Sequence, residues 1–233
     1  MRRRVVFVLL GATAIAVAVF LLFPDLDLVV ARRTLPADGY FLLYGVRVFY
    51  LLHLWIQYLA PATIAFFVVA AIAYFRRRPI WMITAWQALY VVAVFAIGPG
   101  FLVNTVVKDH SHRPRPGDMQ EFGGKFSYAP PFAFGGACDK NCSFVAGDPA
   151  TGFAFLAPAL LLPPRRRRAG IAASLLLGGG IGLMRMLQGG HFFSDVIFSG
   201  LIVAATVLAL HWAMFRAGGR PRGRWGLRLS SVA

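Results

Sequence analysis

The stretch RRRRAGIAASLLLGGGIGLMRML, residues 165–187, holds the two features that decide the fold. A block of arginines is followed by an apolar run of about the length that crosses a lipid bilayer. Other basic blocks, at residues 2–4, 76–78 and 216–228, flank the other apolar runs of the chain. This alternation predicts helices that cross a membrane, with the arginines gathered on one side of it.

The overall composition agrees with an integral membrane protein. Of the 233 residues, 58% are hydrophobic and only 14% are charged, whereas a soluble domain carries roughly twice that charged fraction. Alternating segments of about ten residues, typical of outer-membrane barrels, are absent from the sequence. The net charge of +15 does not indicate a nucleic-acid partner, because the cations lie in blocks between apolar runs. We therefore expect a single all-α membrane domain over residues 1–233.

Six apolar segments are interpreted as transmembrane helices forming one bundle. They cover residues 5–23, 55–75, 80–105, 149–163, 169–187 and 192–214. With six spans, every basic block and both termini fall on the cytoplasmic side of a bacterial inner membrane. The long segment between the third and fourth spans is then periplasmic.

Two segments in the N-terminal part of the chain are interpreted separately: the N-terminal helix and the aromatic stretch at residues 40–54. The N-terminal MRRR and the apolar run after it could be a cleaved signal peptide, but no small-residue cleavage site follows, so we expect an uncleaved helix. Residues 40–54 are rich in aromatic side chains, and we predict an interfacial helix that leads into the second span.

Cys138 and Cys142 are the only cysteines, and both lie in the segment between the third and fourth spans. An oxidising periplasm would allow them to form a disulfide, which is the expected state. Two free thiols or a metal-binding pair remain as alternatives. A zinc pair usually has a shorter spacing and needs two further ligands.

Three polar clusters lie at helix ends on the predicted periplasmic side. They are KDHSHRPRP at residues 108–116, SFVAGDPATG at residues 143–152 and RMLQGGHFFSD at residues 185–195. Ionisable side chains at the depth of a membrane are costly, and they are candidates for function for that reason.

The cluster at residues 185–195 has the residue types of a nucleophilic phosphate site. His191 and Asp195 are four residues apart, so on a helix they share a face, and the carboxylate can orient the imidazole. His191 is predicted in the first turn of a helix, where the dipole favours an anion. The guanidinium of Arg185 suits bidentate contact with a phosphate. Together they predict nucleophilic catalysis on a phosphate group.

The other two clusters each have two readings. Asp148, followed by proline, is interpreted either as a helix N-cap or as a general acid whose pKa is raised at the membrane edge. Gly147 before it offers an unencumbered backbone N–H. Lys108 and Arg115 read as two spaced phosphate-binding cations, or as a basic anchor near lipid headgroups.

The remaining histidines are expected to have no catalytic role. The lone His53 and His211 lie on apolar segments and are expected to be interfacial or packed residues. His110 and His112 are expected to be solvated loop residues. A metal-dependent hydrolase that uses them with His191 and Asp195 is an alternative, but the sequence has no metal-ligand motif such as HExxH.

The spacings resemble those of the type 2 phosphatidic acid phosphatase (PAP2) superfamily. Residues 108–116 match its first motif, K-x6-RP, and residues 185–195 match its third, SR-x5-H-x3-D, with Met184 in place of the serine. The second motif, PSGH, is replaced by VAGD at residues 145–148, so Asp148 stands where the family has a histidine.

The resemblance implies a six-helix enzyme that cleaves phosphomonoesters or pyrophosphates of lipids without a metal or other cofactor. By position, His191 would be the nucleophile that forms a phosphohistidine, and Asp195 would orient it. Asp148 would do the work of the missing histidine by protonating the leaving group. The phosphoryl oxygens would be held by Lys108, Arg115, Arg185 and the backbone of Gly147.

The substrate class follows from a looser resemblance. NCSFVAGD, residues 141–148, is similar to a CSFVSGE-like stretch of bacterial lipid A 1-phosphatase-like proteins, which favours a lipid A 1-phosphate. Alternatives are phosphatidylglycerophosphate, undecaprenyl pyrophosphate, or phosphotransfer to another lipid. A protein that binds or transports a lipid phosphate without chemistry is the non-enzymatic alternative. The sequence does not indicate an oligomeric state.

Overall fold

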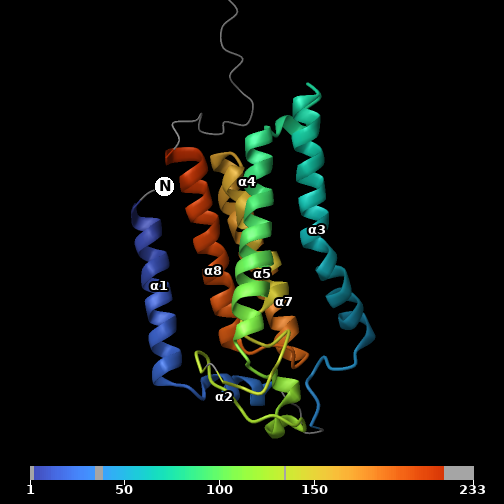
Figure 1. Ribbon diagram of the computed structural model, residues 1–233, viewed down its shortest axis with the longest axis vertical. Helices are drawn as coiled ribbons and strands as arrows, with labels where there is room; N and C mark the ends of the chain where they lie inside the picture. The colour runs from blue at the N-terminus through green and yellow to red at the C-terminus, as the bar shows by residue number, and fades with distance from the viewer. Residues whose placement is uncertain (1–2, 35–38, 134, 218–233) are drawn as a thin grey trace, which may run out of the picture.

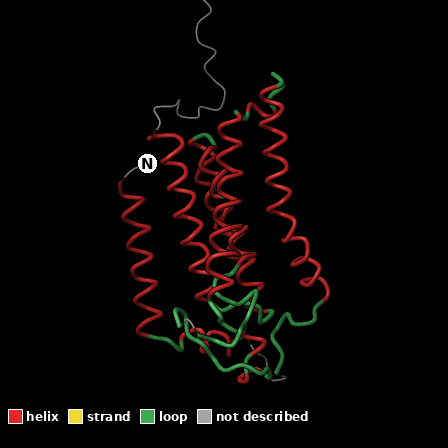
Figure 2. The backbone as a smooth tube through the Cα atoms, in the orientation of Figure 1, coloured by secondary structure: helices red, strands yellow, loops and turns green. Residues whose placement is uncertain are grey.

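The computed structural model describes residues 3–34, 39–133 and 135–217, and these form a bundle of long helices capped at one end by loops (Figures 1 and 2). Most of the predicted C-terminal basic block lies outside the described residues. The α-helices are α1 (Arg3–Leu22), α2 (Leu26–Arg33), α3 (Arg47–Phe75), α4 (Ala85–Phe95), α5 (Gly147–Ala154), α6 (Leu156–Leu161), α7 (Pro164–Leu187) and α8 (Phe193–Trp212). The described residues contain no β-strand, only an isolated bridge between Met119 and Phe126.

Within these described ranges, five helical segments are long and apolar enough to cross a membrane. They are Arg3–Leu22, Arg47–Phe75, Ala85–His110, Pro164–Leu187 and Phe193–Phe215. In the third of them, α4 continues without a break as a π-helix over Ala96–Val107 and a 3₁₀ turn at Lys108–His110. The prediction of an all-α membrane protein is therefore confirmed.

The predicted fourth span, residues 149–163, is divided into the short helices α5 and α6. Pro158 has no N–H to donate to the carbonyl of Ala154, and its ring crowds that carbonyl, so a continuous helix is interrupted at the residue where α5 ends. The two helices together cover about 22 Å at most, less than the ~30 Å of a hydrocarbon core. Neither helix alone reaches the length of a membrane span.

Helix α5 lies in the middle of the bundle. Seven of its eight residues are buried, and it packs mainly against α7 and α8. A Cβ on Gly152 would lie 2.7 Å from the Cα of Gly178, so the two backbones approach closely where α5 meets α7. In the glycine run of α7, Gly178 makes this contact, whereas Gly179 and Gly180 face open space. The contact holds α5 close against α7.

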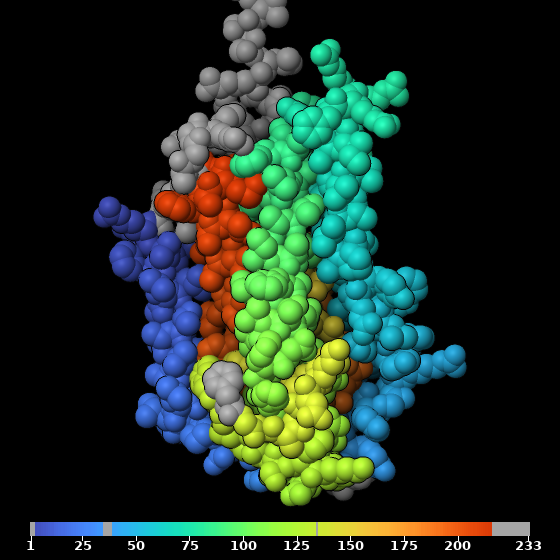
Figure 3. All heavy atoms as spheres, viewed as in Figure 1, coloured from blue at the N-terminus to red at the C-terminus, as the bar shows by residue number. Residues whose placement is uncertain are grey.

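The helix ends fall into two groups (Figure 1). The start of α1, the α3–α4 turn, the α6–α7 turn and the end of α8 lie at one end, and these carry the basic blocks. Helix α2, residues 111–146 and the α7–α8 turn lie at the opposite end, which we call the site end. There, residues 111–146 form a thick cap over the helices (Figure 3).

Helix α3 differs from the expected arrangement. Residues 40–46 form turns, and residues 47–54 are the first two turns of α3 rather than a separate interfacial helix. Pro61 lies inside α3, at the end of the first half of the helix. Since α3 begins at the site end, its first turns carry their side chains, His53 among them, toward the polar clusters.

Candidate active site

His191 lies immediately before α8, whose N-cap is Phe192, and not in the first helical turn as predicted. It is only 2% exposed, and its Nδ1 lies 2.8 Å from the backbone carbonyl of Ser143. A carbonyl can only accept, so Nδ1 must carry the hydrogen and donate it. The lone pair of the neutral imidazole is then on Nε2, where a nucleophile needs it.

Asp195 stands beside the same imidazole and is fully buried. Its Oδ2 lies 3.5 Å from Nδ1 of His191 and accepts hydrogen bonds from the Ser143 hydroxyl at 2.6 Å and the Phe192 backbone N–H at 2.7 Å. Its Oδ1 accepts from Nη1 of Arg113 at 2.7 Å. The predicted pair of His191 and Asp195 is thus brought together by the turn before α8. Ser143 contacts both residues, through its carbonyl to His191 and through its hydroxyl to Asp195.

Arg113 connects the site to the beginning of the chain. Its side chain is buried, its Nη2 donates to Asp27 of α2 at 2.8 Å, and its Nε donates to the carbonyl of Ala129 at 2.8 Å. The guanidinium carbon lies 4.1 Å from the ring centre of Phe192. Burial opposes its charge, but the carboxylates of Asp195 and Asp27 outweigh burial and raise the pKa of Arg113. One buried cation is therefore shared by two buried carboxylates.

Sequence reasoning did not single out Arg113, Asp27 or Ser143 as parts of the site. Arg113 stands at a position that the K-x6-RP spacing leaves open, between the two residues that the motif selects. Asp27 precedes Arg113 by 86 residues, and no spacing rule joins them. An acid inside the short apolar stretch LDLVV was the one available signal for Asp27, because a charge in such surroundings needs a partner.

Arg185 and Arg115 are held on two sides of an open cleft. Arg185 is mostly buried; its Nε lies 3.1 Å from the Asp148 carboxylate, and its Nη1 donates to Gln188 at 2.8 Å. Arg115 donates from Nη2 to the carbonyl of Asn141 at 3.0 Å. Both guanidiniums line the same cleft, as the phosphate-binding prediction requires.

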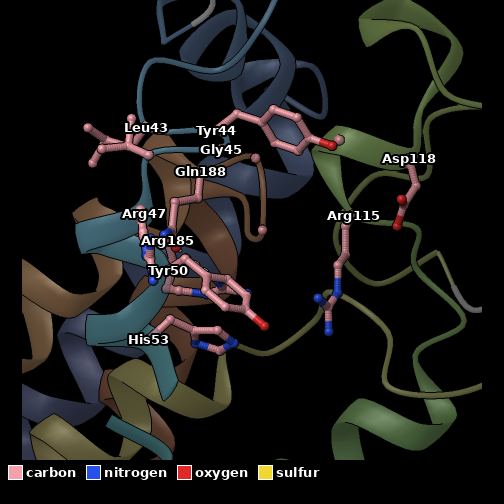
Figure 4. Close-up of a pocket in the computed structure, with 14 residues that line it drawn as sticks. Leu43, Tyr44, Gly45, Arg47, Tyr50, His53, Arg115, Asp118, Arg185 and Gln188 are labelled. Atoms are coloured by element: carbon pink, nitrogen blue, oxygen red, sulfur yellow. Dashed lines mark hydrogen bonds between the residues drawn. The ribbon is translucent and has the colours of Figure 1, made fainter. Parts of the chain in front are cut away.

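The cleft lies between the first turns of α3, the segment after Arg115 and the α7–α8 turn (Figure 4). Its volume is about 560 Å³. Gly190, the residue before His191, lines the cleft, whereas His191 and Lys108 do not. The cleft therefore comes within one residue of the buried His191, and it presents the side chains of Arg115 and Arg185.

Burial, more than any single charge, favours the neutral form of the His191 imidazole. Burial lowers the pKa of His191 to about 4; Asp195 opposes this shift, while the positive charges of Lys108 and Arg185 add to it. Lys108 and Arg185 are thus close enough to act on the imidazole. At neutral pH the Nε2 lone pair is available for attack on phosphorus.

Asp148 differs from both predictions made for it. The N-cap of α5 is Ala146, so Asp148 lies inside the helix and does not cap it. Its carboxylate lies beside His53 and Arg185, and such neighbours favour the ionised form of an acid. These contacts do not favour the raised pKa that the sequence suggested for Asp148. Nδ1 of His53 lies 2.9 Å from Oδ2 of Asp148, a contact that the reading of His53 as a packed or interfacial residue did not foresee.

Gly147 begins α5 at a crowded point. An added Cβ would lie 2.3 Å from the side-chain oxygen of Asn104, so no other residue fits there without a shift. Its neighbour Ala146 donates from its backbone N–H to the carbonyl of Asp195 at 3.1 Å. The start of α5 is thus joined to the first turn of α8, directly after His191.

Cys138 and Cys142 are joined as a disulfide in the cap. The loop that they close contains Asn141, whose carbonyl holds Arg115. His112 contacts the carbonyl of Cys138 through Nδ1 at 2.9 Å, which ties the loop to the first polar cluster. Over residues 3–34, 39–133 and 135–217, no group of three or more His, Cys, Asp or Glu side chains is placed to hold a metal ion.

Replacement of Gly190 by alanine is expected to displace Arg185. An added Cβ would lie 2.7 Å from Nη2 and 2.9 Å from Cζ of Arg185, so the guanidinium must leave its place in the cleft. We expect kcat/KM for a phosphate ester to fall by about 10- to 100-fold, the loss of roughly one charged hydrogen bond. Gly180→Ala in α7 is the matched control, because nothing lies within 4 Å of its added Cβ. Equal activity of both variants would contradict the assigned position of Arg185.

Comparison with known proteins agrees with the family resemblance that the motif spacing indicates. The model of the PAP2 superfamily matches residues 84–219, more than half of the chain. The chain is 37% identical over 199 residues to a lipid A 4'-phosphatase of Francisella tularensis subsp. novicida, which is 84% of this chain and 90% of that protein. It is 36% identical over 117 residues to the lipid A 4'-phosphatase of Rhizobium leguminosarum, about half of each protein.

No solved structure matches the chain with significance. The family match includes the three polar clusters with the helices that carry them, and it begins only after α3. The chain therefore belongs to the PAP2 superfamily and is a phosphoric monoester hydrolase of the membrane.

Proposed function

We propose that the enzyme removes the 4'-phosphate of a lipid A-type lipid at the periplasmic face of a bacterial inner membrane. The observation that supports the chemistry is the contact of Nδ1 of His191 with the carbonyl of Ser143, which leaves Nε2 free beside an arginine-lined cleft. The choice of lipid rests on the Francisella relative, of which this chain covers 90%. That relative is named for the 4'-phosphate, so we replace the 1-phosphate favoured by the sequence alone.

The proposed reaction has two steps on His191. Nε2 attacks phosphorus, the ester P–O bond breaks, and a phosphohistidine forms; water then hydrolyses the P–N bond and releases phosphate. Asp195 holds the ring and stabilises the positive charge that develops on it. Asp148 acts on the leaving-group side, as its place in the second motif suggests.

Three cations and one backbone group would stabilise the transferring phosphoryl group. Its transition state spreads negative charge over the equatorial oxygens, so fixed positive groups are the main contribution that a protein can make. Lys108, Arg115 and Arg185 fill this role in the proposal. Gly147 offers a backbone N–H at the start of α5, where the helix dipole also favours an anion.

The proposed topology has six passes, with the helix pair α5–α6 as a short central one. A short pass is tolerated here because other helices surround α5. The described basic blocks lie at the end opposite the site, which the positive-inside rule assigns to the cytoplasm, so we place both termini there. The disulfide in the cap agrees with an oxidising compartment such as the periplasm. The exposed tyrosines beside the cleft, Tyr44 and Tyr50, agree with a substrate that lies at the membrane interface.

The proposal is tested by incubating purified protein in detergent, with a chelator, with lipid A that carries both phosphates. Mass spectrometry of the products should show loss of the 4'-phosphate and retention of the 1-phosphate. Phosphatidylglycerophosphate and undecaprenyl pyrophosphate serve as competing substrates in the same panel. Loss of the 1-phosphate alone, or faster turnover of another lipid, would contradict the 4' assignment while leaving the phosphatase intact.

A further inference from the structure

We infer that His53, a residue outside the three family motifs, is the catalytic residue that protonates the leaving oxygen, with Asp148 holding its ring. The inference rests on the proposed two-step reaction and names a group that the reaction needs. His53 belongs to α3, which precedes the segment matched by the family model. It reaches Asp148 across 95 residues of sequence, with Nδ1 and Oδ2 2.9 Å apart.

The contacts of Asp148 argue for another proton source. Its Oδ2 lies 2.9 Å from Nδ1 of His53 and 3.1 Å from Nε of Arg185, so one carboxylate oxygen faces two nitrogen groups that can carry a hydrogen. Such surroundings favour the ionised carboxylate. An ionised carboxylate has no proton to give. It can, however, orient and stabilise a protonated imidazole, the role that Asp195 has toward His191.

His53 is placed where the leaving group would emerge. Its side chain lines the cleft together with Arg115 and Arg185, and its ring extends from α3 toward the side on which Arg115 lies (Figure 4). The imidazole of His53 thus comes next to the position where the second family motif carries a histidine. The short side chain of Asp148 leaves the room that this ring enters.

The two ring nitrogens of His53 have different surroundings. Nδ1 is buried against Asp148, and no hydrogen bond of good geometry reaches it from the described residues. Nε2 lies 3.1 Å from the amide nitrogen of Gln57 on the exposed side of the ring; an amide nitrogen donates, so Nε2 is the acceptor in this arrangement. When a substrate displaces Gln57, Nε2 becomes free to take up a proton from water and pass it to the leaving oxygen.

The proton balance of the reaction closes with His53. In the first step, Nε2 of His191 bonds to phosphorus, the P–O electron pair goes to the leaving oxygen, and the Nε2 proton of His53 moves to that oxygen to give the alcohol. In the second step, water attacks the phosphohistidine and gives its proton to the now neutral His53. The P–N electron pair returns to His191, and both histidines regain their starting states.

The test uses the full-length protein and the phosphomonoester lipid that the wild type hydrolyses. His53→Ala should lower kcat by about 10²- to 10⁴-fold with little change in KM, the usual contribution of a general acid. Added imidazole should restore at least a tenth of the lost rate by entering the vacated space. His53→Gln fills that space and retains an N–H toward Asp148, so it should be equally slow and insensitive to imidazole. His110→Gln, an exposed histidine of the first cluster, is the matched control and should be fully active.

Several results would overturn the inference. They are a His53→Gln variant with kcat within about threefold of wild type, a loss confined to KM, or a folded His53→Ala variant that imidazole does not activate. If His53→Ala does not fold, His53→Gln decides the matter by its kcat alone. A wild type without activity on any lipid phosphate would overturn the proposed function and this inference together. An active wild type with an active His53→Gln variant would overturn only the inference.

Discussion

Replacement of His191 by asparagine is expected to lower phosphate release by about 10⁴-fold or more, the scale seen when a catalytic nucleophile is removed. An asparagine amide retains an N–H in place of Nδ1, so the hydrogen bond to the carbonyl of Ser143 can persist. What the variant lacks is the Nε2 lone pair. The loss of activity is therefore expected without a large loss of stability, which thermal unfolding in detergent would check.

The control for this experiment is His110→Gln, since His110 is exposed and its Nδ1 contacts only the carbonyl of Val106 within its own turn. Purified His191→Asn that retains more than about a hundredth of the wild-type rate would rule out His191 as the nucleophile. In that case Asp148 would be the next group to examine, because its ionised carboxylate also lies beside Arg185.

Replacement of Arg113 by methionine is expected to destabilise the protein by about 3–5 kcal/mol, because it leaves buried charges without their partner. Both Asp27 and Asp195 are 0% exposed, and each accepts a hydrogen bond from this one guanidinium. Burial already raises the pKa of Asp27 against the pull of Arg113. Without Arg113 the two carboxylates would have to take up protons, and the altered Asp195 would no longer hold His191.

Two companion variants separate the effect of Arg113 from a general loss of packing. Arg166→Met removes an exposed arginine at the opposite end of the bundle and should leave the midpoint of thermal unfolding unchanged. The double variant Asp27→Asn/Arg113→Met leaves one unpaired carboxylate instead of two, so it should be more stable than Arg113→Met. If Arg113→Met unfolds at the wild-type temperature, the buried network has no role in stability.

The sequence predicted the helical fold well because apolar run length and arginine placement report directly on a bilayer. It did not foresee that residues 149–163 form two helices, because length and hydropathy suggest one helix there, whereas Pro158 divides it after Ala154. The expected interfacial helix at residues 40–54 became the start of α3 for a related reason. Hydropathy marks where a segment prefers to lie, but it does not mark where a helix begins.

The site was predictable where its residues lie within one motif. The spacing within each motif was enough to pair His191 with Asp195 and Lys108 with Arg115 as candidates, because a short segment limits which side chains can lie close together. It could not join Arg113 to Asp27 or His53 to Asp148, because each pair comes from helices and loops far apart in the chain. Which helices become neighbours depends on packing, such as the close approach of Gly152 and Gly178, and a single sequence does not report that.

Capture of the phosphorylated enzyme is the sharpest test of the proposed mechanism. Wild-type protein is mixed with a ³²P-labelled lipid phosphate and quenched within the first turnover, one sample with alkali and a parallel sample with acid, and the labelled peptide is identified by mass spectrometry. We expect a phosphoramidate on His191 that survives the alkaline quench, is lost in acid and is absent from His191→Asn. The mechanism would be wrong if the acid-quenched sample carried label that hydroxylamine releases, as from a carboxylate, or if the wild type turned over without label on His191.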